Sequence, residues 1–198
     1  MTIAKHAEAP GAVTGPSQGG DLPRPSPLSP RAAQIVAAAR ELLEEEGPGA
    51  LTMRALAERI GIRAPSLYKH FADKAAVEAA LIEQGLAEVG TVLYAALDAP
   101  EPVVSVLEAY RRAALAAPNM YRLTTSGPLP RHRLAAGLEE WAGTPFFLAA
   151  GDPHLAQALW SFAHGMVILE LDGRYPEGSD LGRTWSEGAR AFTARKAH

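Results

Sequence analysis

Apolar residues recur at helical spacing along most of the chain from residue 30 onward. In the first stretch they share one face of an α-helix: Ile35, Ala39, Leu42 and Leu43. Ser29 suits the N-cap and Pro30 the first turn, whereas Gly47-Pro48-Gly49 cannot continue a helix. The pattern therefore predicts a first helix that starts at Pro30 and ends before the glycines.

Two short helices are expected next. Thr52 suits the N-cap of the first, whose inward side chains would be Leu56 and Ile60. Gly61 separates it from the second, which would bury Leu67 and Phe71. Together with the first helix, these segments predict a compact three-helix head.

The remaining apolar positions also follow a helical pattern. Asp73 suits the N-cap of a long helix that starts at Lys74 and ends near Asp98. Further helices are expected at 102–117, 119–125, 131–149, 153–172 and 178–195. No pair of strands with a hairpin turn appears. The predicted fold is all-α, with a three-helix head at 30–74 and a larger helical domain at 75–198.

Composition narrows the class of protein further. The 198 residues contain no cysteine, so disulfides and thiol chemistry are excluded. No run reaches the roughly 20 apolar residues of a membrane span, and the N-terminus lacks the layout of a signal peptide. The six histidines are scattered without a His-x-x-x-His pair, which predicts no metal site and no cofactor. We expect a soluble, cytoplasmic protein that makes no contact with membranes.

The segment from Thr52 to Ile62 has the pattern of a helix-turn-helix. Such a motif needs a small residue where its two helices cross, which Ala57 supplies. It also needs a residue that tolerates the left-handed conformation four positions later, which Gly61 supplies. The apolar residues that would fix the angle between the helices are Leu56, Ile60, Ile62 and Leu67. Helix-turn-helix motifs bind DNA through their second helix.

The outward face of the second helix has the chemistry of a DNA contact. The helix opens at Arg63-Ala64-Pro65-Ser66, where proline is tolerated in the first turn. Its outward side chains would be Ser66, Lys69 and His70, with Tyr68 at the edge. These groups and Lys74, at the start of the next helix, supply donors and cations without a carboxylate. The net charge of −3 does not exclude such a local basic face.

The head resembles the DNA-binding domain of TetR-family repressors over roughly residues 31 to 80. The matching positions are Leu51, Thr52, Arg54, Leu56, Ala57, Gly61, Ile62, Pro65, Ser66, Leu67, Tyr68, His70, Phe71 and Lys74. The resemblance implies that Ala64, Pro65 and Ser66 lie closest to bases. It implies that phosphates are held by Thr52, Tyr68, His70 and Lys74. Because Ala64 has no hydrogen-bonding group, sequence discrimination would fall on Arg54, Arg63, Ser66 and Lys69. The alternative is that Tyr68 and His70 are core aromatics of a helical bundle.

A homodimer on a palindromic double-stranded operator is expected, because one head makes few contacts and two heads can share one duplex. The resemblance implies that the last two long helices form the dimer interface. The interface candidates recur along these helices: Leu155, Leu159, Phe162, Met166, Leu181, Trp185 and Phe192. The alternative for each is an ordinary place in the core of its own chain.

Family members commonly release DNA when a small molecule binds their larger domain. The cavity candidates here are Tyr110, Tyr121, Trp141, Phe147, Trp160 and His164, which suit a small apolar or aromatic effector. The same residues would also suit a plain core. Trp160 and His164-Gly165 further resemble a subset of TetR-like C-terminal domains with a Trp…His-Gly signature.

Other functions lack support in the sequence. No Gly-x-Ser-x-Gly motif, phosphate loop, His-Glu-x-x-His motif or dinucleotide fingerprint occurs, so we predict no enzymatic activity. A scaffolding protein would use the motif only for packing, and a steep salt dependence of DNA binding would exclude it.

Residues 1–29 differ from the rest of the chain in composition. Six prolines and four glycines fall within residues 1–30, and no apolar pattern is present. Such a segment buries too little surface to offset its ordering entropy. We expect a disordered tail at 1–29. The alternative is an arm on DNA, for which only Lys5 and Arg24 are available.

Overall fold

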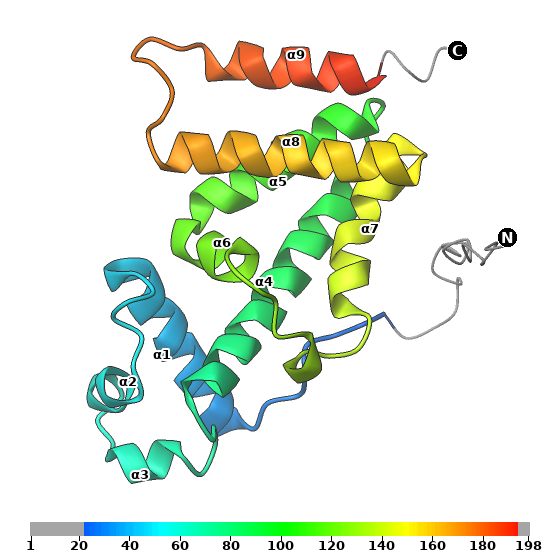
Figure 1. Ribbon diagram of the computed structural model, residues 1–198. Coiled ribbons are helices and arrows are strands. Elements are labelled where there is room, and N and C mark those ends of the chain that lie inside the picture. Colours follow the sequence, from blue (N-terminus) through cyan, green and yellow to red (C-terminus); the bar gives the residue numbers. More distant parts are fainter. Residues whose placement is uncertain (1–21, 194–198) are drawn as a thin grey trace, which may run out of the picture.

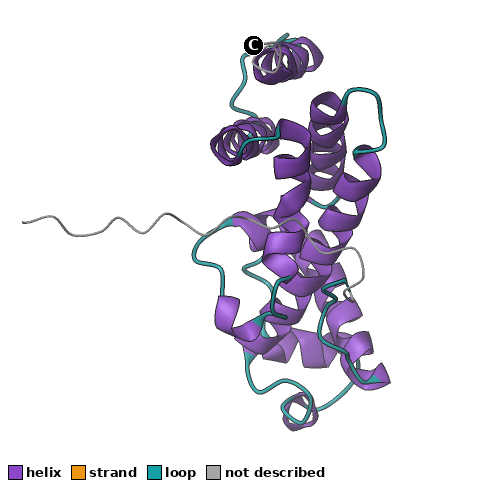
Figure 2. Ribbon diagram, turned by 90° about the vertical axis from the view of Figure 1, so that its right-hand side faces the viewer, coloured by secondary structure: helices purple, strands orange, loops and turns teal. Residues whose placement is uncertain are grey.

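The computed structural model describes residues 22–193 as an all-helical protein without strands in that range (Figures 1 and 2). The elements are α1 (Pro30–Glu46), α2 (Met53–Arg59), α3 (Ala64–Leu67), α4 (Lys74–Ala96), α5 (Pro102–Ala116), α6 (Pro118–Thr125), the 3-10 helix η1 (Arg131–Arg133), α7 (Leu138–Ala150), α8 (Pro153–Leu171) and α9 (Leu181–Thr193). The predicted fold class is confirmed. No helix of residues 22–193 is long and apolar enough to cross a membrane.

The helix starts of the head are fixed by side-chain caps, as predicted. Each cap oxygen accepts a backbone N–H of the first turn: Ser29 from Ala32 at 3.2 Å, Thr52 from Ala55 at 3.1 Å and Asp73 from Ala76 at 2.7 Å. Caps of this kind satisfy N–H groups that have no partner within the helix. The sequence therefore sets where α1, α2 and α4 begin.

The hydrophobic core of the head extends into the first part of the larger domain, whose main core is a separate cluster. Leu56 and Leu67 are almost fully buried against α1, and Phe71 closes the end of α3. The same cluster continues through Leu81 of α4 and Met120 of α6. The core of the head therefore includes residues of α4 and α6 as well as of α1 to α3.

The larger domain is a bundle around α4, which runs from the head to the far end of the molecule (Figure 1). α4 packs against α5, α6 and α7, and α8 packs against α5 and α7. α9 packs against α5 and α8 at the end opposite α3 (Figures 1 and 2). Two glycines permit close approach: a Cβ at Gly90 would lie 2.3 Å from the Trp141 ring, and one at Gly188 would lie 2.0 Å from the Phe162 ring.

The expected helix at 131–149 is wrong in its first part. Residues 131–133 form η1 only, and α7 begins at Leu138. Gly137 has a φ of +77° and so cannot belong to a right-handed helix. The apolar pattern did not reveal this break, because a lone glycine is tolerated inside many helices.

Residues 22–29 follow a defined extended path along the larger domain, unlike the disorder expected for residues 1–29. The backbone N–H and hydroxyl of Ser26 donate to the Glu83 carboxylate at 2.7 and 3.0 Å. The N–H of Ala135 donates to the same carboxylate at 2.5 Å. Glu83 thus ties this segment, here called the N-terminal strap, to α4. Residues 1–21, including Lys5, lie outside the described residues.

Candidate nucleic-acid interface and ligand cavity

The turn between α2 and α3 is a Schellman motif. The N–H of Ile62 donates to the carbonyl of Ala57 at 3.0 Å, and that of Gly61 donates to Glu58 at 3.2 Å. Gly61 has a φ of +67°, the left-handed value the sequence predicts. Ala57 is buried beneath the turn with 3% exposure. These features fix the angle at which α3 leaves α2.

Short α3 is anchored from within and presents polar groups outward. Leu67 has 0% exposure and Phe71 has 6%, whereas Tyr68 is 53% exposed. Lys69 and His70 are also exposed. Tyr68 and His70 are therefore not core aromatics of this chain, and the packing alternative fails for both.

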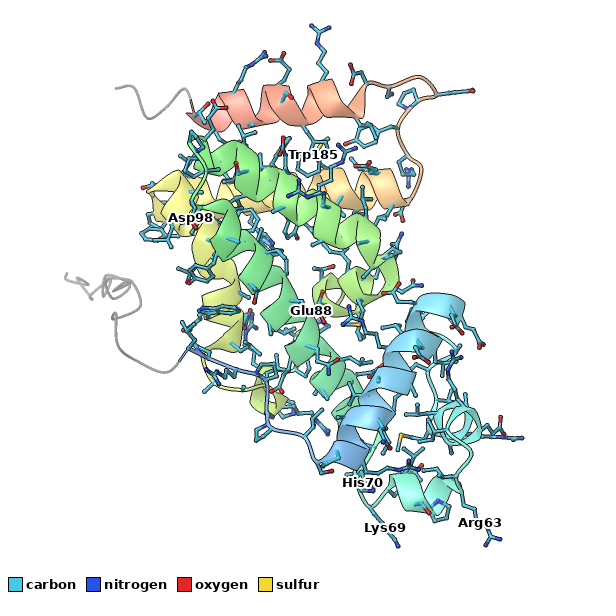
Figure 3. All side chains as sticks on the ribbon, turned by 180° about the vertical axis from the view of Figure 1, so that it is seen from behind. Arg63, Lys69, His70, Glu88, Asp98 and Trp185 are labelled. Carbon is cyan, nitrogen blue, oxygen red and sulfur yellow. The ribbon has the colours of Figure 1, made fainter. Side chains whose placement is uncertain are left out.

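All ten predicted DNA-contact residues remain accessible to some degree. Those exposed are Thr52, Arg54, Arg63, Pro65, Tyr68, Lys69 and His70, and those half-buried are Ala64, Ser66 and Lys74. They come from three consecutive elements at the end of the molecule opposite α9 (Figure 1). Arg63 and Lys69 point away from the rest of the chain (Figure 3). We call this surface the α3 face.

Two cations of the α3 face form i,i+4 ion pairs, and two others have no ion-pair partner among residues 22–193. Arg54 pairs with Glu58 at 2.9 Å, and Lys74 pairs with Glu78 at 3.2 Å. Within residues 22–193, neither Arg63 nor Lys69 has an ion-pair partner. Exposed i,i+4 pairs contribute little to stability, so phosphate can replace the carboxylates. The Thr52 hydroxyl accepts the cap bond and still has its proton to donate.

The larger domain contains a cavity of about 810 Å³ between α4, α5, α6, α7 and α8. Four predicted residues line it: Tyr110, Tyr121, Phe147 and Trp160. Trp141 lies outside the lining and stacks instead on Tyr94, with ring centroids 5.2 Å apart. His164 is also outside it, behind Tyr121. A volume of this size suits a drug-sized ligand.

A chain of hydrogen bonds runs from the cavity wall into the core. The hydroxyls of Tyr110 and Tyr121 are 3.1 Å apart, and that of Tyr121 lies 2.7 Å from His164 Nδ1. Trp160 stacks on His164 with centroids 5.9 Å apart. Burial lowers the pKa of His164, which keeps the ring neutral at pH 7, and burial raises the pKa of both tyrosines. Tyr110, Tyr121 and Trp160 thus place polar groups in the cavity wall, and His164 contacts Tyr121 from behind it.

The head contributes to the cavity wall, which the sequence did not predict. Arg40 of α1 and Glu88 of α4 both line the cavity and form a bidentate ion pair, with Arg40 Nη2 2.7 Å from Glu88 Oε2. No local pattern could reveal this pair, because its members lie 48 positions apart. A ligand that fills this part of the cavity would therefore contact the first helix of the head.

Glu44 makes a second link between the head and the larger domain. Its carboxylate accepts the backbone N–H groups of Asn119 at 3.2 Å and Met120 at 2.7 Å. A run of three glutamates such as Glu44–Glu46 is usually a solvated helix surface. Glu44 instead caps the start of α6, whose Tyr121 and Thr124 line the cavity.

Three of the seven interface candidates lie in the core of the chain itself. Leu159 is 0% exposed, and Met166 and Trp185 are 6% exposed, so these three cannot provide a contact surface. The others are half-buried: Leu155, Phe162, Leu181 and Phe192. Helical spacing finds the apolar stripe of a helix but does not say what covers it. The large apolar side chains that α8 exposes are Trp160 and Leu169.

Two family models match the chain. Residues 35–81 match bacterial regulatory proteins of the tetR family, and residues 103–192 match the tetracyclin repressor-like C-terminal domain. The first spans the helix-turn-helix and the second spans most of the cavity. Neither match identifies the Trp…His-Gly subset.

Curated relatives give the same assignment. An uncharacterized HTH-type transcriptional regulator of Mycobacterium tuberculosis is 30% identical over 186 residues, covering 86% of this chain and 84% of that protein. The class A tetracycline repressor from transposon 1721 of Escherichia coli is 50% identical over 54 residues. The latter match spans 27% of this chain and only 25% of the repressor.

Solved structures share the architecture. A putative regulatory protein, SCO4313, superposes with a TM-score of 0.69 at 24% identity, covering 82% of this chain and 94% of that one. A TetR variant from Acinetobacter baumannii in complex with minocycline superposes with a TM-score of 0.57 at 26% identity, covering 82% and 93%. The first likeness concerns the fold alone.

Proposed function

The chain belongs to the tetR family of bacterial regulatory proteins, and from this premise we propose that it is a homodimeric repressor released from its operator by a small apolar or aromatic effector. Its assignment as a transcriptional regulator, not an enzyme, follows from the family. The observation that carries the effector-release part is the direct contact of the cavity with the head through Arg40. The Acinetobacter TetR variant was solved in complex with minocycline, which supports a small-molecule ligand for this chain by analogy.

The α3 face provides the DNA contacts in this proposal. Its exposed cations and hydroxyls match the major groove, where phosphate contacts position the protein and base contacts select the sequence. Thr52, Tyr68, His70 and Lys74 hold phosphates. Arg54, Arg63, Ser66 and Lys69 read the bases, while Ala64 and Pro65 make apolar contacts.

The dimer brings two α3 faces onto one palindromic operator. We place its interface on the outer surfaces of α8 and α9, with Leu155, Phe162, Leu181 and Phe192 at its edge. The buried residues Leu159, Met166 and Trp185 instead hold these helices to their own chain. Two-fold symmetric helix-turn-helix proteins read half-sites about 34 Å apart, or a multiple of that.

Release follows from the two links between cavity and head. A ligand that changes the spacing of α4 and α6 would shift α1 through Arg40–Glu88 and through Glu44. The distance between the two α3 faces then changes, and DNA and ligand weaken each other reciprocally. Such coupling typically amounts to about 1–3 kcal/mol.

We also place the larger domain in the subset with the Trp…His-Gly signature. The stacking of Trp160 on His164 supports a shared role for the two signature side chains. As a regulator of this kind, the protein would act on chromosomal DNA in the cytoplasm.

Two substitutions on the α3 face separate the phosphate and base roles. Lys74→Ala should weaken binding to operator and random DNA alike, and flatten the salt slope by about one unit, because one phosphate contact is lost. Ser66→Ala should weaken operator binding by about 1 kcal/mol or more and leave random DNA almost unchanged. Fluorescence anisotropy on both DNAs at several salt concentrations measures the difference.

The matched control is Arg112→Ala, on the exposed surface of α5 in the larger domain, outside the α3 face and the proposed interface on α8 and α9. It should change neither affinity nor slope. Equal losses on both DNAs for Ser66→Ala would contradict the base role, and an unchanged slope for Lys74→Ala would contradict the phosphate role.

A further inference from the structure

The hydrogen-bond donors and charges around the cavity identify the chemical class of its ligand. We propose that the cavity binds an uncharged, largely apolar molecule that carries a neutral hydrogen-bond donor, such as a hydroxyl, directed at Tyr110 and Tyr121. This inference rests on the proposed function in so far as the cavity is the effector site. The inference deepens the proposed function because it names the chemical class of the effector.

The first argument is charge. The four charged side chains of the lining form two ion pairs: Arg40 with Glu88, and Arg131 with Glu139. Arg131 binds Glu139 through two hydrogen bonds of 2.6 Å. An ionised ligand would therefore find no unpaired opposite charge among the lining residues. It would have to compete with the partner of a bidentate pair, or remain uncompensated beside the buried Tyr110 and Tyr121, which is unfavourable.

The second argument concerns the hydrogen-bond donors of Tyr110, Tyr121 and His164, which are linked to one another. We assign the proton of the neutral His164 ring to Nε2, so that its Nδ1 accepts from the Tyr121 hydroxyl, and the Tyr110 hydroxyl in turn donates to Tyr121. In this direction the protons of both hydroxyls are used. The tyrosine oxygens keep lone pairs that accept a further hydrogen bond.

The threonines of the lining point to the same conclusion. The hydroxyls of Thr124 and Thr125 both donate to the backbone carbonyl of Tyr121, at 3.0 and 2.7 Å. Their protons are therefore unavailable to a ligand. Gln157 retains donors, but it lies exposed at the rim. Other donors of the lining belong to the ion-paired guanidinium groups of Arg40 and Arg131, and the tyrosine end of the cavity accepts hydrogen bonds.

Four probes with one naphthalene skeleton test this inference on the full-length chain without DNA, by isothermal titration calorimetry. They are 1-naphthol, 1-methoxynaphthalene, 1-naphthoate and 1-naphthylmethylammonium. We expect 1-naphthol to bind about three- to tenfold more tightly than 1-methoxynaphthalene, which only accepts. We expect both ions to bind at least about tenfold more weakly than 1-naphthol.

Three variants report on the named groups. Tyr110→Phe should reduce the affinity for 1-naphthol to about that for 1-methoxynaphthalene, whose own affinity should not change. Glu88→Gln frees Arg40 and should increase the affinity for 1-naphthoate several-fold. Tyr121→Phe provides a second variant should Tyr110→Phe fail to fold, as judged by circular dichroism.

Three results would overturn the inference: an ion that binds wild-type protein as tightly as 1-naphthol, equal affinities of 1-naphthol and 1-methoxynaphthalene, or no binding by any of the four. Failure of the proposed function is a separate outcome. A chain that prefers 1-naphthol but holds its operator unchanged at saturating 1-naphthol would contradict effector release and leave the ligand class intact.

Discussion

Replacing Glu83 with alanine is expected to lower the free energy of unfolding by about 3 kcal/mol. Glu83 is 3% exposed in the middle of α4. Its carboxylate is the acceptor for both Ser26 donors and for the N–H of Ala135. Alanine would leave two backbone N–H groups without partners and detach the strap from α4. Urea denaturation followed by circular dichroism measures the change.

Ser26→Ala is the matched control for Glu83→Ala. It removes only the hydroxyl bond of 3.0 Å and keeps the backbone donor. The expected loss is about 1 kcal/mol. If Glu83→Ala and Ser26→Ala destabilised the protein equally, Glu83 would not be the shared anchor of the strap and the 131–137 segment.

Gly61→Val should weaken operator binding by about tenfold or more. A β-branched residue at a φ of +67° is strained by roughly 1–3 kcal/mol, and the turn relieves that strain by reorienting α3. A Cβ at Gly61 would have no atom within 4 Å, so the effect is conformational and not a steric clash. Anisotropy on the operator and far-ultraviolet circular dichroism together measure binding and fold.

Gly61→Asn separates backbone strain from loss of the glycine itself. Asparagine enters the left-handed region more readily than other side chains, so this variant should keep most of the affinity. Valine and asparagine variants of equal affinity would show that the conformation at Gly61 does not position α3.

The sequence was sufficient to predict those features in which a residue contacts its near neighbours along the chain. Ser29, Thr52 and Asp73 cap helices through bonds that span three residues, and Gly61 sets a turn within α2 and α3. Such bonds depend only on nearby sequence. The all-α fold and the geometry of the helix-turn-helix could therefore be predicted.

Contacts between distant segments could not be predicted in the same way. Glu83 meets the strap 57 positions away, Arg40 meets Glu88 across 48, and Glu44 meets Met120 across 76. From the sequence alone, Glu44, Glu83 and Glu88 would each be assigned to the solvated surface of a helix. Only the packing of α1, α4 and α6 gives them partners.

The apolar stripes of α8 and α9 show a related limit. Spacing identified Leu159, Met166 and Trp185 as one apolar set, and the chain's own core covers them. The aromatic residues of the larger domain likewise fall into two groups, those that line the cavity and those that pack elsewhere. Tyr110 and Tyr121 line the cavity, whereas Trp141 packs over Gly90. The spacing of apolar residues predicts which side chains are buried, but it does not predict which segment or chain covers them.

Selection of bound DNA from a random pool, carried out with the full-length chain, tests the central claim most directly. The account predicts one enriched palindrome whose half-sites lie about 34 Å apart or a multiple of that, as two α3 faces require. Binding to it should fall steeply as salt rises. Recovery of no common sequence, or of a binding signal that salt does not change, would contradict the account.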